Sequence, residues 1–175
     1  MIDFAQLQAD LTTWVRDVSG LDVNHVIPAN DNGARPLDQY ATIRVLDPDT
    51  IGHDAYTYKT NAIDPTSVDI NYNGLRQIMV SINVYRGDAL GIMNKLKSSF
   101  DRVLTQDYFE SKDIGIINTS ATRDLSADVN GAWEERRQTD FFFFLIDEET
   151  ETVEAIETIK GTNLIDGKDY TVTSV

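Results

Sequence analysis

The segment Trp133 to Ile146, which reads WEERRQTDFFFFLI, constrains the fold of this chain more than any other. Its four consecutive phenylalanines belong to an apolar run far shorter than the roughly 18 residues that a membrane-spanning helix needs. As one strand, the segment would span roughly 46 Å, whereas a usual strand spans roughly 17–20 Å. We therefore expect part of this strand to project beyond the body of the domain.

Alternation along such a strand places large apolar side chains on both of its faces. We assign one set to each face: Phe141, Phe143 and Leu145, and opposite them Phe142, Phe144 and Ile146. Helices of the same chain can cover one face, but three large apolar side chains left in water forfeit about 2 kcal/mol each. The second face is covered either by a loop of the same chain, such as residues 59–74, or by a neighbouring subunit. The reversed assignment of the two faces stays open.

If a neighbour covers the second face, the charged half of the segment forms a polar rim or fixes the register between subunits. The predicted interface residues are Trp133, Arg136, Arg137, Gln138, Phe142 and Phe144. An aspartate at position 142 or 144 is then expected to damage assembly more than folding.

The rest of the pattern predicts two helices and several strands. A helix over 3–18 is predicted, with Asp3 as its capping residue and Gly20 as the stop signal after it. A second helix over 88–105 carries an apolar stripe from Ala89 to Leu104. Strands are predicted at 40–46, 55–60, 75–86, 114–118 and 152–160, with a loop or an excursion from the sheet at 61–74 and a solvated turn at 147–151. Asp166-Gly167, between two β-prone runs, predicts a terminal hairpin.

This order predicts an α+β fold: a mostly antiparallel sheet with two main helices packed on one face, a long projecting strand or hairpin, and a C-terminal β-hairpin. We expect residues 1–160 to form a single domain and residues 161–175 to form the hairpin extension. The amino terminus, MIDFAQLQADL, shows no secretion signal, and the chain has no cysteine for disulfides or thiolate metal sites.

No catalytic, cofactor or metal site is predicted. His25 and His53 are far apart in the sequence, and no phosphate-binding glycine motif or nucleophile elbow occurs. Asp47, Asp49 and Asp54 lack the calcium-loop pattern and suit a solvated turn. We therefore expect the chain not to be an enzyme.

The net charge of −14 disfavours tight binding to nucleic acid, which relies on lysine and arginine. An acidic surface lets DNA pass without sticking, because like charges repel over a Debye length of about 8–10 Å. The charge equally suits a role in solubility alone.

The order of these segments resembles the neck and tail terminator proteins of tailed bacteriophages over about residues 1–160. The matching stretches are YATIRVL, LRQIMVSINVYRGDAL, DIGIINTS, and WEERRQTDFFFFLI leading into ETVEAIETIKG. Two features are the most telling: the strand–helix junction at Val84–Leu90, and the pattern Trp-Glu-x-Arg-x-Gln-x-Asp-Phe at Trp133–Phe141.

The resemblance implies a structural virion protein of the tail and neck, assembled in the cytoplasm of the bacterial host. Such proteins form a ring, usually of six identical subunits, at the head-proximal end of the tail. The ring caps the tail tube or sheath, stops polymerisation and meets the neck connector, while DNA passes through its lumen without specific binding. No membrane is involved.

Two alternatives stay open. One is another phage part, such as a head–tail adaptor, connector or collar protein of the neck. The other, from a different class, is a small enzyme or ligand-binding module that uses aspartate and glutamate side chains, which a pocket lined by perturbed carboxylates would support.

Overall fold

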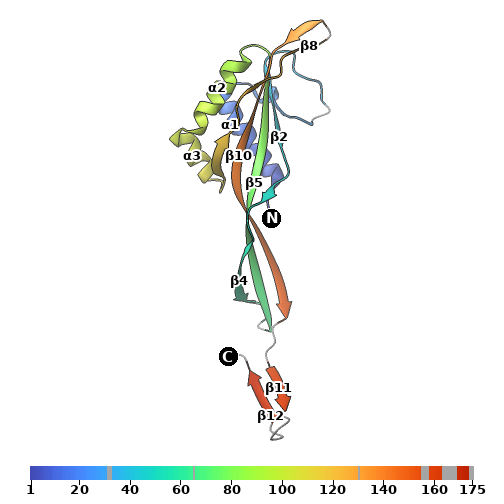
Figure 1. Cartoon of the computed structure of the whole chain (residues 1–175), viewed down its shortest axis with the longest axis vertical. Helices are drawn as coiled ribbons and strands as arrows, with labels where there is room; N and C mark the ends of the chain where they lie inside the picture. Colours follow the sequence, from blue (N-terminus) through green and yellow to red (C-terminus); the bar gives the residue numbers. More distant parts are fainter. Residues whose placement is uncertain (31–32, 65, 130, 155–157, 163–168, 174–175) are drawn as a thin grey trace. The chain divides into compact units, whose positions relative to one another are not determined.

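The computed structural model describes residues 1–175 except 31–32, 65, 130, 155–157, 163–168 and 174–175 (Figure 1). By their contacts the residues fall into two compact units. Unit 1 comprises Met1–His53 and Leu75–Ile146, and unit 2 comprises Asp54–Gly74 and Asp147–Val175. Each unit is described by itself.

The described residues form three α-helices and twelve strands. The helices are α1 (Phe4–Ser19), α2 (Ala89–Phe100) and α3 (Val103–Glu110), with a short 3-10 turn at Val23–His25. The strands of the main sheet are β1 (Val26–Pro28), β2 (Tyr40–Val45), β3 (Asp49–Thr50), β4 (Ala55–Thr60), β5 (Ser67–Tyr85), β6 (Gly115–Thr119), β7 (Arg123–Asp124) and β10 (Arg136–Glu154). Two separate pairs are β8 (Ala127–Val129) with β9 (Ala132–Glu134), and β11 (Thr158–Thr162) with β12 (Asp169–Thr173).

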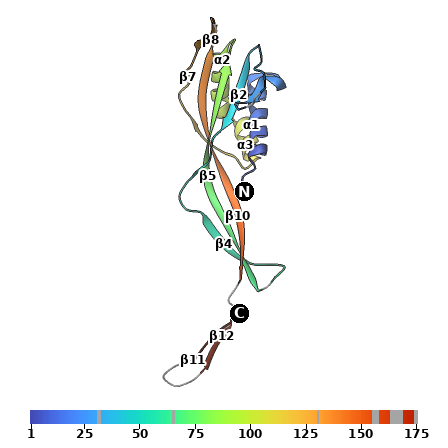
Figure 2. The same ribbon diagram turned by 90° about the vertical axis from the view of Figure 1, so that its right-hand side faces the viewer.

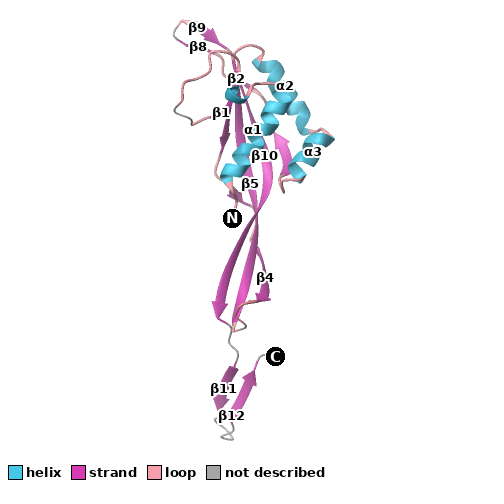
Figure 3. Ribbon diagram, turned by 180° about the vertical axis from the view of Figure 1, so that it is seen from behind, coloured by secondary structure: helices cyan, strands magenta, loops and turns pink. Residues whose placement is uncertain are grey.

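The main sheet has the strand order β1-β2-β5-β10-β6. Among the described pairs, β1 runs parallel to β2, while β2 runs antiparallel to β5, and β6 antiparallel to β10. In unit 1, α1, α2 and α3 gather on one side of this sheet (Figures 2 and 3). The predicted α+β class, with a mostly antiparallel sheet and helices on one face, is confirmed.

Helix α1 begins and ends where the sequence predicts. The Asp3 side chain accepts hydrogen bonds from the backbone N–H groups of Ala5 and Gln6, both at 3.0 Å, and so satisfies two free donors of the first turn. Gly20 ends the helix at φ 74°, a left-handed conformation that glycine adopts without steric cost. The apolar residues of the helix turn inward, with Leu7, Leu11, Trp14 and Val15 buried.

The second predicted helix, over 88–105, is wrong as a single element. The chain turns at Asp101 and Arg102, so that α2 ends at Phe100 and α3 starts at Val103. The turn rotates the inward face: Thr105 and Phe109 are buried, whereas Val103 and Leu104 are 68% and 83% exposed. A straight helix would have buried Val103 and Leu104 and left Phe109 outside the core.

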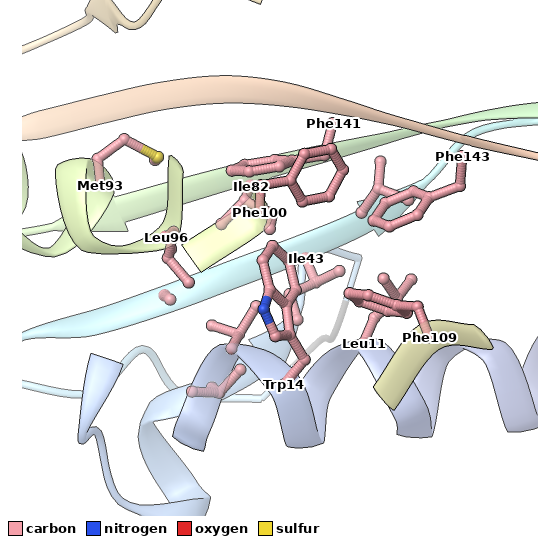
Figure 4. Close-up of a cluster of buried hydrophobic side chains, with 14 of the residues drawn as sticks. Leu11, Trp14, Ile43, Ile82, Met93, Leu96, Phe100, Phe109, Phe141 and Phe143 are labelled. Carbon is pink, nitrogen blue, oxygen red and sulfur yellow. The ribbon is translucent and has the colours of Figure 1, made fainter. Parts of the chain in front are cut away.

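Aromatic rings fill the space between α1 and the sheet (Figure 4). The Trp14 ring centroid lies 5.3 Å from those of Phe109 and Phe141, and 5.9 Å from that of Phe100. The pairs with Phe109 and Phe141 are edge-to-face, a favourable geometry for aromatic rings, and the pair with Phe100 is tilted. Of the two faces proposed for the phenylalanine strand, the helices cover the one that carries Phe141 and Phe143, which are 0% and 1% exposed.

Two strands are longer than the sequence predicts. Strand β5 starts at Ser67, so the expected loop at 61–74 is wrong from residue 67 onward, and strand β10 continues to Glu154 through the expected turn at 147–151. In unit 2, β4 pairs with β5 in register from Ala55 opposite Asn73 to Thr60 opposite Val68. Thr150 donates a hydrogen bond to Asn71 at 2.7 Å. Polar side chains thus bond across strands there, and strand pairing overrides the local turn preference.

The strand predicted over Trp133–Ile146 is interrupted near its start, because β9 ends at Glu134 and β10 starts at Arg136. The predicted terminal hairpin is present as the antiparallel pair β11–β12. Its expected turn at Asp166-Gly167 lies outside the described residues. The division into a domain of residues 1–160 and an extension of 161–175 stays a prediction.

Candidate functional site

The sheet of unit 1 has one face turned away from the helices, which we call the open face. Alternate residues of three adjacent strands define it: Thr42 and Arg44 of β2, Ser81 and Asn83 of β5, and Arg136, Gln138, Asp140, Phe142 and Phe144 of β10. Four of the six predicted interface residues, Arg136, Gln138, Phe142 and Phe144, therefore lie together on this face.

Half of the open face is a polar network that crosses from β5 to β10. The Nε and Nη2 atoms of Arg136 donate to Asn83 Oδ1 at 3.1 and 3.0 Å, and the guanidinium lies 5.2 Å from the ring centroid of Tyr85. Gln138 Nε2 donates to Ser81 Oγ at 2.7 Å. These bonds pair side chains that are otherwise costly to bury, and they hold the open face in one arrangement.

The network surrounds a hollow of about 410 Å³ with an unusual charge for this chain. Its charged lining groups are the guanidiniums of Arg44, Arg123 and Arg136 and the carboxylate of Asp140, which pairs with Arg123. Three cations thus face one anion in a chain whose net charge is −14. Such a surface suits a partner group that accepts hydrogen bonds or carries negative charge.

The other half of the open face is apolar. Phe142 and Phe144 are half-buried, and Ile146 is 59% exposed, in contrast to the buried Phe141 and Phe143 on the helical side. Gly115 of β6 brings its backbone close to Phe144, since a Cβ added there would lie 3.3 Å from Phe144 Cβ. Within unit 1, the face thus combines a polar network with aromatic side chains that keep part of their surface in solvent.

The remaining two predicted residues lie elsewhere. Arg137 points to the opposite side of β10, where it forms ion pairs with Asp124 at 2.5 Å and Glu135 at 3.4 Å. Trp133 is 74% exposed on the β8–β9 hairpin. The six predicted residues therefore form one patch of four and two separate positions.

Sequence reasoning missed an aromatic clamp beside the network. The rings of Tyr40 and Tyr85 stack at 4.5 Å with an angle of 3° between them, and Arg86 lies over Tyr40. Arg86, at φ 63°, also pairs with Glu134 at 2.9 Å and donates to the carbonyl of Pro36 at 2.7 Å. Burial, aided by the nearby Tyr85 and Glu134, raises the pKa of Tyr40. The strand–helix junction at Arg86-Gly87 was the one signal in the sequence that could have pointed to this clamp.

Chemical machinery is not evident in the part of the chain that the structure describes. No group of three or more histidine, cysteine, aspartate or glutamate side chains there could hold a metal ion. None of the helices described is both long and apolar enough to cross a membrane. The hydrogen-bonding groups, the arginines and the partly exposed aromatic side chains of the open face suit it to binding another molecule.

Comparison with known proteins supplies the family. No curated protein matches the chain. A protein-family model described as phage neck terminator protein matches residues 5–168, which is nearly the whole chain. This family is structural, which confirms the prediction that the chain is not an enzyme. The chain belongs to the phage neck terminator protein family and is a structural protein of the bacteriophage neck and tail.

Proposed function

We propose that this terminator acts as a ring of identical subunits, a homohexamer, at the head-proximal end of the tail. There it caps the tail tube and sheath, ends polymerisation and joins the tail to the neck connector. Family membership supports a tail-terminating role and contact with tail-tube and neck proteins. The ring and the way in which it joins its neighbours are the proposed part.

One observation carries the proposal: the open face leaves Phe142 and Phe144 half-buried and Ile146 exposed, although helices seal the other side of the same strand. Aromatic side chains beside a rim of arginine are typical of protein interfaces. A neighbouring subunit that covers them removes apolar surface from water, and it can satisfy the cationic hollow with an acidic group of its own.

A closed ring uses two different patches on each subunit, because rotation brings one patch of a copy against another patch of the next. We place Arg136, Gln138, Phe142 and Phe144 in one such patch. Trp133 and Arg137, which lie outside the open face, take part where the β8–β9 hairpin or β7 meets a neighbour or a neck protein.

The same proposal gives the acidic charge a role. Within the virion, a ring of chains that each carry a net charge of −14 repels the phosphate backbone and lets DNA move through the lumen without specific contacts.

The direct test is to measure the mass of the purified protein by native mass spectrometry and to image it by electron microscopy, alone and with tail-tube protein. We expect a closed oligomer, and we expect Phe142→Asp to leave a folded chain that assembles poorly. Phe141→Asp is the matched control on the helical side, and it should abolish folding itself. A wild-type chain that stays monomeric at high concentration and beside tail-tube protein would refute the ring.

A further inference from the structure

Strand β6 is an open edge of the main sheet. It ends the strand order and, among the described residues, has a hydrogen-bonded neighbour on one side only, namely β10. Five residues, Gly115 to Thr119, thus present a row of backbone donors and acceptors to solvent. No proline or lysine blocks this edge, although both are common means by which proteins protect edge strands.

A hollow of about 760 Å³ runs beside this edge, between β6 and the helices α2 and α3. Its apolar floor includes Phe100 and Ile116, and its ionisable lining groups are Lys97, Asp101, Glu110 and Asp113. Lys97 donates to the carbonyl of Ser120 at 3.2 Å. The described part of the chain offers none of the three carboxylates a side-chain partner. The hollow therefore suits an extended segment that brings hydrogen-bond donors and positive charge.

Strand β4 has the complementary properties. It pairs with β5 alone in the described residues, and all six of its residues are exposed. It carries no acidic residue, and its polar side chains are two tyrosines, two threonines and Lys59. Alternation places Ala55, Thr57 and Lys59 on one face and Tyr56 and Tyr58 on the other. The rings of the two tyrosines lie 5.5 Å apart, and their exposed fractions are 57% and 67%.

We infer that β4 of a second copy adds to the open edge of β6 and extends the sheet from one subunit to the next. The small face of β4 turns toward the hollow under α2 and α3, where Lys59 meets the carboxylates of Asp101, Glu110 and Asp113. The tyrosine face turns toward the open face of the sheet. There Tyr56 and Tyr58 cover the side of Phe142 and Phe144, which pair with Asn118 and Gly115 of β6.

This inference rests on the proposed self-assembly and names its contact. The two partners are different surfaces, as a closed ring requires. Their lengths agree, since five residues of β6 face six of β4 and the shared register covers roughly 17 Å. Main-chain hydrogen bonds supply affinity in this mode of recognition, and the alternating side chains supply specificity.

The absence of cysteine in the chain makes a clean cross-linking test possible. Thr57→Cys on β4 and Thr119→Cys on β6 each introduce a single thiol, and in the proposed contact both side chains lie on the side of the hollow, because Thr119 pairs with Phe141 on the helical side of the sheet. The two variants, one of them carrying a mass tag, are mixed and treated with a short bis-maleimide. We expect a covalent dimer that contains one copy of each variant. Neither variant should cross-link with itself, and a control that pairs Thr57→Cys with Ala9→Cys on the exposed side of α1 should give no product.

A charge exchange tests the side chains. Lys59→Glu should weaken self-association about tenfold, because it sets like charges together at the contact. Lys59→Arg should leave self-association unchanged, and adding Glu110→Lys to the Lys59→Glu chain should restore it. Unchanged melting temperatures show that the variants fold.

The outcomes separate this inference from the proposed function. A wild-type chain that assembles but gives no mixed dimer overturns the β4–β6 contact and leaves the ring standing. Dimers of either single variant with itself indicate a two-fold contact and also overturn it. A wild-type chain that never assembles, alone or with tail-tube protein, refutes both.

Discussion

The two adjacent phenylalanines Phe143 and Phe144 should respond differently to the same truncation. Phe143 is 1% exposed, and its ring contacts those of Phe109 and Phe100 at 5.1 and 5.3 Å. Phe143→Ala therefore opens a cavity in the core and should cost about 3–5 kcal/mol of unfolding free energy. Phe144 is half-buried on the open face, so Phe144→Ala should cost about 1 kcal/mol.

In a chain of 175 residues, each kcal/mol shifts the melting temperature by about 2–4 °C. Phe143→Ala should thus lower it by roughly 10 °C and Phe144→Ala by only a few degrees. Urea unfolding at low protein concentration measures the first effect, and native mass spectrometry at high concentration measures assembly, which Phe144→Ala should weaken more. Equal losses of stability for the two variants would refute the division of this strand into a core side and an interface side.

The remaining predictions concern a helix cap and two tyrosines. Asp3→Ala should lower the unfolding free energy by about 1 kcal/mol, because the N–H groups of Ala5 and Gln6 lose their acceptor; Asp3→Asn, which can still cap, should lose much less in the same urea titration. Burial raises the pKa of Tyr40 and of Tyr108 in the folded state. The stability that these two neutral tyrosines contribute is therefore fully present below the pKa of the unfolded chain, about 10, and is lost as the pH rises through their raised pKa in the folded state. In urea titrations from pH 8 to 11, the unfolding free energy of the wild type should therefore fall, and it should fall less steeply in Tyr40→Phe and Tyr108→Phe. A dependence on pH identical to that of the wild type in both variants would contradict this. At pH 8, Tyr40→Phe should cost nothing, since its buried hydroxyl has no hydrogen-bond partner among the described residues, whereas Tyr108→Phe should lose about 1 kcal/mol with the bond to the Asp10 carbonyl.

Local pattern predicted the elements whose ends are chemically marked. Asp3 and Gly20 bound α1 because a capping carboxylate and a left-handed glycine act within a few residues of the sequence. The apolar residues Ile78, Val80, Ile82 and Val84 alternate along the sequence and in this way predicted the buried half of β5, again from residues that are close together in the chain. Such signals need no knowledge of the rest of the fold.

Pattern failed where a distant segment decided the outcome. The break between α2 and α3 places Phe109 against Trp14 and Phe143, which a periodicity of apolar residues along one helix does not encode. Likewise, residues 67–74 read as part of a loop and residues 147–151 as a solvated turn, yet each is strand, with cross-strand bonds such as that from Thr150 to Asn71 at 2.7 Å. Their strand state depends on a partner remote in the sequence.

The candidate site was predictable in part. The sequence indicated that β10 has two apolar sides, and it placed Phe142 and Phe144 opposite Phe141 and Phe143. It did not indicate that Arg136 would meet Asn83, which lies 53 residues away, because that pairing follows from the order of strands in the sheet. Alternation along the strand already sets Arg137 on the side of Phe141 and Phe143, but its pairing with Asp124 emerged only from the structure.

The two tryptophans give this protein a pair of built-in optical reporters. Trp14 lies in a dry nest of phenylalanine rings at 3% exposure, whereas Trp133 is 74% exposed on the β8–β9 hairpin. Iodide in solution should therefore quench the emission of Trp133 and spare that of Trp14, whose emission we expect to be blue-shifted and to report only whether the core is intact. A loss of iodide quenching without a change in the emission of Trp14 indicates that the β8–β9 hairpin has become covered. A change in the emission of Trp14 indicates unfolding of the core.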